Sequence, residues 1–327
     1  MTHMANPLAT VDQLYRRTYS FGALPSDLQD AIFFATQSLT QAAGLLLRLP
    51  QSVTAQASVV LARYWLEESL LASEFSDVSA ACLFLVAKLS ANPSRPRDIC
   101  NVYAYLLSPE SPLFRPKAAS NSSPPAPPDP SKYYLSESAY AAFQSRILRL
   151  EARILYTLRF DTHVALPHGL TVTYLQALDF CGDATRAKIT RRAVAYLNTA
   201  LLSPQMLYLT HQPNALAVAA IYSAARDAEI QAKMPDCPWW EVFDVDREEL
   251  GFLVVGMRSL EGSVRKLQAD FEGFGTSGMV TRGHINTEMT RRGLKLNNGI
   301  AAGSAEVDEE EDMMRLMDER AERMQAL

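Results

Sequence analysis

Residues 80–88 read AACLFLVAK and residues 218–226 read VAAIYSAAR, two runs of small and apolar residues that each end in a base. Small side chains let neighbouring helices approach closely, so each run is predicted to be the central helix of a bundle. The same pattern in both halves of the chain predicts two similar helical units.

Helical periodicity continues on both sides of each run. In the first half, helices are expected over residues 27–49, from 52, over 76–90, from 96, and over 136–160. In the second half they are expected over residues 170–180, 184–202, 213–230, 239–243 and 246–267. No run of alternating apolar and polar residues predicts a strand, so the fold class is all-α.

The chain divides by composition into four parts: an N-terminal arm (1–24), a first five-helix unit (25–162), a second (163–268), and a linker with an acidic tail (269–327). Within the first unit, residues 109–130 contain eight prolines and are predicted to be a solvated loop.

The last part begins with a glycine-rich linker and ends in a charged helix candidate at residues 309–324. It is interpreted either as a solvated tail or as a segment that folds on a partner.

Composition and charge exclude several classes of protein. Of the 327 residues, 48% are hydrophobic and 20% charged, which argues against a disordered or fibrous chain. The net charge is −5, but residues 304–327 contribute −6, so the remainder is nearly neutral. Direct nucleic-acid binding is therefore not expected. No apolar run is long enough to span a membrane, so we expect a soluble, unsecreted protein without membrane contacts.

No catalytic centre, metal site or cofactor site is predicted. His163 and His168 flank Pro167 at a junction between helices, where a turn is the favoured interpretation. The four cysteines form no close pair, and the phosphate-binding and nucleophile motifs of common enzyme folds are absent.

Two charges depart from the apolar pattern. Lys88 continues the apolar stripe three residues after Leu85, and Glu151 lies between Ile147 and Ile154 on another helix. Because isolated charges are costly to bury, the two side chains either form an internal ion pair, with the lysine stem lying on apolar surface, or offer hydrogen bonds to a partner's backbone.

Residues 41–51, QAAGLLLRLPQ, resemble the cyclin L branch of the cyclin family at the first box helix and its exit. The resemblance extends over about residues 24–268. It is supported by Arg63, the run 81–88, Arg97-Asp98-Ile99, Glu151-Ala152-Arg153, Pro167-His168, Tyr174-Leu175-Gln176, the run 219–226 and Trp240.

This resemblance implies tandem five-helix cyclin boxes without catalytic activity that bind and activate a cyclin-dependent kinase of the PITSLRE type. It also implies a nuclear role in transcription or pre-mRNA splicing, with splicing or transcription factors as possible partners of the tail. In the family, the positions of Lys88 and Glu151 contact the kinase near its mobile αC helix. Leu89 and Leu155 occupy apolar positions beside them.

The chain also departs from the family pattern. Two acidic residues usually follow the lysine, whereas here Leu89 and Ser90 follow Lys88. The arginine-serine-rich tail of long cyclin L forms is absent from this sequence. The alternative function is therefore a non-kinase scaffold, in which tandem cyclin boxes hold a transcription or splicing assembly.

Overall fold

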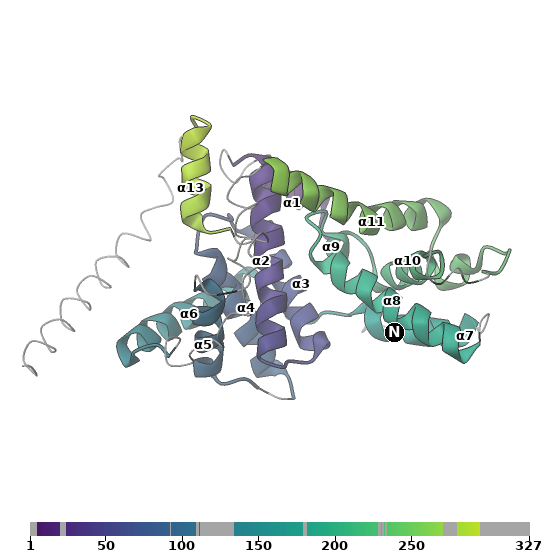
Figure 1. The fold of residues 1–327 in the computed structure, drawn as a ribbon, viewed down its shortest axis with the longest axis horizontal. Helices are drawn as coiled ribbons and strands as arrows, with labels where there is room; N and C mark the ends of the chain where they lie inside the picture. Colours follow the sequence, from purple (N-terminus) through teal and green to yellow (C-terminus); the bar gives the residue numbers. More distant parts are fainter. Residues whose placement is uncertain are drawn as a thin grey trace, which may run out of the picture.

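The computed structural model describes residues 5–19, 24–91, 93–108, 111, 134–178, 182–227, 230, 232, 234–270 and 280–294. Within these ranges the regular structure is entirely helical (Figure 1). The predicted all-α fold class is thereby confirmed.

The first half is built around α4 (Phe75–Leu89). Around it lie α2 (Ser26–Leu46), α3 (Gln51–Glu67), α5 (Pro96–Leu107) and α6 (Glu137–Thr157). Every residue of α4 from Phe75 to Ala87 is buried, and Lys88 is the first exposed one. The small-residue run therefore forms the central helix, as predicted.

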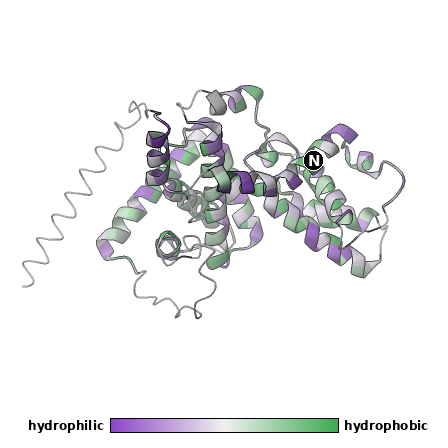
Figure 2. Ribbon diagram, turned by 45° about the horizontal axis from the view of Figure 1, so that its top comes forward, coloured by the Kyte–Doolittle hydropathy of each residue, from purple (hydrophilic) through white to green (hydrophobic). Residues whose placement is uncertain are grey.

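The second half repeats this arrangement around α10 (Pro213–Ala225). Here α7 (Pro167–Leu178), α8 (Asp183–Leu201) and α11 (Arg247–Asp270) pack against α10, and the 3-10 helix η4 (Trp239–Phe243) covers one end. The hydropathy colouring in Figure 2 shows hydrophobic and hydrophilic residues alternating along the outer helices of both halves. The exact unit boundaries at residues 25, 163 and 268 stay a prediction.

Three of the helices in the described ranges were not expected from the sequence: α1 (Val11–Tyr19), α9 (Leu207–Thr210) and α13 (Arg282–Arg291). The helix α13 lies within residues 269–327, the segment that the sequence analysis assigned to a linker and an acidic tail. Although α13 is mostly polar, Ile285 and Met289 lie one turn apart and are fully buried. Arg292, just after the helix, pairs with Asp27 of α2 at 2.7 Å, so this segment returns to the first half. The helix candidate at 309–324 lies outside the described residues.

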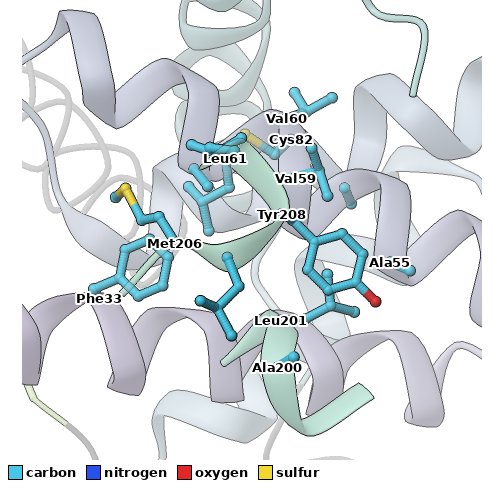
Figure 3. Close-up of a cluster of buried hydrophobic side chains, with 14 of the residues drawn as sticks. Phe33, Ala55, Val59, Val60, Leu61, Cys82, Ala200, Leu201, Met206 and Tyr208 are labelled. Carbon is cyan, nitrogen blue, oxygen red and sulfur yellow. The ribbon is translucent and has the colours of Figure 1, made fainter. Parts of the chain in front are cut away.

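A hydrophobic contact joins the two halves. Figure 3 shows Met206 and Tyr208, at and within α9, among Phe33, Ala55 and Val59 of the first half. The Tyr208 hydroxyl donates to the carbonyl of Leu197 at 3.0 Å, so this buried phenol is satisfied. The two sets of helices thus share one continuous core.

A buried asparagine adds polar connections at this boundary. The Asn6 amide accepts from the backbone N–H of Ala165 and donates to its carbonyl, both at 2.8 Å. The backbone of Asn6 exchanges two further hydrogen bonds of 3.0 Å with the side chain of Gln212, which precedes α10. The guanidinium of Arg63 on α3 reaches the carbonyl of His163 at 2.8 Å. Residues from three distant parts of the chain therefore fix the connection between the halves.

In residues 41–51, the stretch that resembles cyclin L, Gly44 lies where α2 packs closely against α3. A Cβ atom at Gly44 would lie 2.3 Å from Oγ1 of Thr54 and 2.7 Å from its Cγ2. After α2 ends, Arg48 adopts a left-handed backbone and the N–H of Leu49 bonds to the Gly44 carbonyl at 2.9 Å. Gly44 thus permits the tight turn from α2 into α3.

We expect Gly44→Ala to lower the free energy of unfolding by about 1–3 kcal/mol, because the added methyl group overlaps Thr54. Thr54→Ala in the same chain should restore part of this loss, which a double-mutant cycle by urea unfolding would measure. Gly262→Ala is the matched control: its Cβ meets open space, so it should be neutral or stabilising. Equal effects of Gly44→Ala and Gly262→Ala would contradict the close contact.

Two half-buried histidines make the stability depend on pH. Nε2 of His168 lies 2.9 Å from Oδ1 of Asn198, which also accepts from the Gln51 side chain at 3.0 Å. His211 stacks on Phe252 with 5.3 Å between ring centroids. Burial lowers the pKa of both imidazoles. The folded state therefore favours their neutral forms.

Below a pH of about 6.5 these histidines bind protons more readily in the unfolded chain than in the folded chain. We therefore expect the free energy of unfolding to fall as the pH drops from 7.5 to 5.5. The variant His168→Gln/His211→Gln should show a smaller fall, measured by urea unfolding at both pH values. Exposed His163→Gln is the control for the loss of an imidazole outside the half-buried pair, and the double variant should show a smaller fall than this control. An unchanged fall in the double variant would refute this explanation.

Candidate functional site

The two charges that depart from the apolar pattern meet in the structure. Nζ of Lys88 donates to Oε1 of Glu151 at 3.0 Å, joining the last turn of α4 to the middle of α6. The Lys88 side chain is 57% exposed, whereas that of Glu151 is only 8% exposed. The pair therefore lies at the molecular surface, with the acid beneath the base.

Within α4, the sequence contains one acid and one base, and both pair with α6. Asp77 in the first turn accepts from Nε of Arg146 at 2.9 Å, and Lys88 in the last turn binds Glu151. This polarity matches the helix dipole, which favours an acid at the N-terminus and a base at the C-terminus. The two ion pairs fix how α6 crosses α4, so the interpretation as an internal ion pair is realised in this chain.

The geometry also leaves the Lys88 ammonium accessible. An ammonium has three N–H groups, and the bond to Glu151 uses one of them. The centroid of the Phe84 ring lies 5.7 Å from Nζ, within the range of a cation–π contact. Glu151 therefore orients a lysine that still presents donors to the surface.

The two predicted apolar neighbours differ in exposure. Leu89 is exposed at the end of α4, and Leu155 is partly buried one turn after Glu151. Leu89 directly follows Lys88, and Leu155 lies four residues after Glu151; their role in a contact stays a prediction.

The sequence analysis missed three further exposed apolar residues of α6 and its exit: Leu148, Tyr156 and Phe160. Tyr156 contacts Phe160 edge to face, with 5.6 Å between ring centroids. Leu148, Ala152 and Tyr156 are spaced four residues apart. This helical spacing could have been recognised in the sequence, next to the spacing of the buried residues. We call the set of Lys88, Leu89, Leu148, Glu151, Leu155, Tyr156 and Phe160 the α4–α6 surface.

The backbone is strained where α6 ends. Arg159 and Phe160 both adopt the left-handed conformation, with φ of 51° and 61°. Glycine usually occupies such positions, and other residues pay about 1–2 kcal/mol each. The turn is held by the N–H of Phe160 bonding to the Leu155 carbonyl at 2.8 Å. The turn places the Phe160 ring against that of Tyr156.

Other chemistry is sparse in the described ranges. No group of three or more His, Cys, Asp or Glu residues there is arranged to hold a metal ion. Near the turn around Pro167, the backbone N–H of His163 donates to Oδ1 of Asp161 at 3.3 Å, and Nε2 of His168 contacts Asn198. Among the described helices, none combines the length and hydrophobicity that a membrane-spanning segment needs.

Comparison with known proteins supports the resemblance of residues 24–268. The chain is 29% identical over 262 residues to Cyclin L homolog cyl-1 of Caenorhabditis elegans, covering 77% of the chain and 50% of that relative. It is 32% identical over 213 residues to human Cyclin-L1, covering 65% of the chain and 36% of that relative. The chain belongs to the cyclin family.

This cyclin spans half or less of the length of these relatives. It also resembles one chain of the yeast RNA Pol II CTD kinase CTDK-1 complex, with a TM-score of 0.60 and 14% identity over 90% of the chain and 85% of that chain. At this identity the likeness concerns the fold, which is that of tandem cyclin boxes. No protein-family model matches the sequence.

Relieving the strain at the end of α6 should stabilise this cyclin. We expect Arg159→Gly to raise the free energy of unfolding by about 0.5–1 kcal/mol, because glycine adopts a positive φ without cost. The control Arg149→Gly, at an exposed position inside α6, should lower it by about 1 kcal/mol. Urea unfolding of both variants checks the prediction, and destabilisation by both would show that the turn is unstrained.

Proposed function

We propose that this cyclin is the regulatory subunit of a cyclin-dependent kinase and binds it through the α4–α6 surface. The observation that carries the proposal is the oriented, exposed Lys88 ammonium at the end of α4, next to exposed Leu89. Lys88 and Glu151 match the positions that contact the kinase in the family. The similarity to cyclins also supports a subunit without catalytic activity of its own.

The surface has the composition of a binding interface. Aromatic residues are enriched at the centres of interfaces, where burial of apolar area carries most of the affinity. Tyr156, Phe160 and Leu89 would supply this area, and Lys88 would donate to main-chain carbonyls of the partner. Leu89 occupies a position where the family usually has an acidic residue. Apolar contacts therefore contribute a larger share of the proposed binding free energy here.

Such a contact would activate the kinase without entering its active site. Phosphoryl transfer requires the β3 lysine of the kinase to pair with a glutamate on its αC helix. A subunit that binds the αC-in state more tightly than the alternative shifts the population toward it. The α4–α6 surface would act on the mobile αC helix in this way.

The relatives support a narrower proposal about the pathway. Several relatives are named cyclin L, so we propose a kinase of the PITSLRE type, a nuclear location, and a role in transcription or pre-mRNA splicing. Splicing or transcription factors are the proposed partners of the tail.

A charge swap tests the site. In Lys88→Glu/Glu151→Lys the two side chains can still pair with each other, but the surface presents the opposite polarity. We expect unchanged helical content and at least about a tenfold loss of kinase co-purification, equivalent to one strong charged contact. The measurement is affinity purification of the tagged full chain from cells, with quantitative identification of bound proteins.

The matched control swaps another ion pair between helices of the same half: Arg97→Glu/Glu137→Arg, whose atoms lie 3.1 Å apart. It should leave co-purification intact. Equal kinase recovery with both swaps would mean that Lys88 and Glu151 serve only to join α4 and α6. Recovery of a splicing or polymerase assembly without any kinase would support the scaffold function instead.

A further inference from the structure

A second charged surface lies at the exit of the other central helix. Arg226 follows α10, and the next residue, Asp227, receives two arginines from neighbouring helices. Arg192 of α8 donates to Oδ2 of Asp227, and Arg258 of α11 lies 3.6 Å from Oδ1. We call four bases the basic cluster: Arg192 and Arg258, which meet at Asp227, Arg226, which precedes Asp227 in the chain, and Lys188, four residues before Arg192.

The cluster has an excess of positive charge. It contains four bases and one acid, and Asp227 is only 13% exposed beneath the arginines. Lys188 is exposed one turn before Arg192, on the same side of α8. Between residues 184 and 201 that helix has four bases and no acid. The near-neutral charge of the chain body thus conceals a local concentration of bases.

The arginines are held in place before any partner binds. Arg192 lies over the Tyr196 ring at 5.6 Å, and the Tyr196 hydroxyl donates to Asp227 at 2.7 Å. Arg258 also approaches the carbonyl of Ser223 at 3.4 Å. The side chains of Arg192 and Arg258 nevertheless stay 48% and 47% exposed. A ligand would meet oriented guanidinium groups and lose less entropy on binding them.

We propose that the basic cluster binds a phosphorylated serine or threonine in a peptide segment of a partner protein. A phosphate group carries a charge of about −1.5 to −2 and three strong acceptor oxygens, which matches several guanidinium groups around one point. A single carboxylate would find much of this charge already neutralised by Asp227. A nucleic-acid backbone would suit an extended basic stripe better than a compact cluster.

This site is distinct from the α4–α6 surface and does not depend on the kinase proposal. In the repeated architecture it occupies the same place in the second half, where the central helix ends beside the last helix of the unit. There the ion pair of the first half is replaced by a surplus of bases. The C-terminal ends of the two central helices, α4 and α10, therefore present different binding chemistry.

The test uses a short fluorescein-labelled peptide with one central phosphoserine and its unphosphorylated counterpart, titrated with the full chain and followed by fluorescence anisotropy. We expect the phosphopeptide to bind at least about tenfold more tightly. The variant Lys188→Gln/Arg226→Gln, which leaves both arginine contacts to Asp227 intact, should weaken phosphopeptide binding about tenfold. Circular dichroism should show unchanged helical content.

Two controls separate the site from general charge. Arg95→Gln/Arg97→Gln removes the same charge from the first half and should leave binding unchanged, as should the Lys88/Glu151 swap. Equal binding of both peptides, or equal weakening by the two neutralised variants, would overturn the proposal. Binding of single-stranded RNA through the same residues, with no phosphopeptide binding, would overturn it in favour of a nucleic-acid site.

Discussion

The burial of α4 on every side is the constraint on which the first half depends. A helix surrounded by other helices has room for charge only near its ends, because an unpaired charge in its middle would be desolvated without compensation. Its sequence obeys this rule: Asp77 lies in the first turn and Lys88 in the last, with apolar or small neutral residues between. Both charges pair with α6, so the core determines where the surface charges lie.

The same rule shapes the second half with a different result. The central helix α10 has no charged residue, and the charges begin with Arg226 and Asp227 at its exit. In the first half a base leaves the core and meets an acid on the last helix of its unit. In the second half a base and an acid leave together and meet Arg258 on the corresponding helix. Two copies of one architecture therefore present different surfaces.

The sequence predicted most of the helices because their buried faces repeat at helical spacing. It also identified Lys88 and Glu151, because each interrupts such a face. It did not show that they bind each other, since they are far apart in the chain and the crossing of α4 and α6 decides their distance. Tyr156 and Phe160 were missed because an exposed apolar residue does not interrupt the pattern of buried residues, as a charged residue does. The helix α13 was missed because two buried residues among polar ones are a weak signal; its docking depends on tertiary contacts such as Arg292 with Asp27.

Each terminal segment of the described chain binds the half that is more distant from it in sequence. The segment around Asn6 binds residues next to the second half, and the segment around Arg292 binds the first. We expect the two halves to unfold together, because opening either half breaks contacts with a terminal segment of the chain. If the chain were cut between its two halves, each fragment would expose the apolar surface that the other half covers. Removing a terminal segment by force or by a protease would also remove contacts from the opposite half.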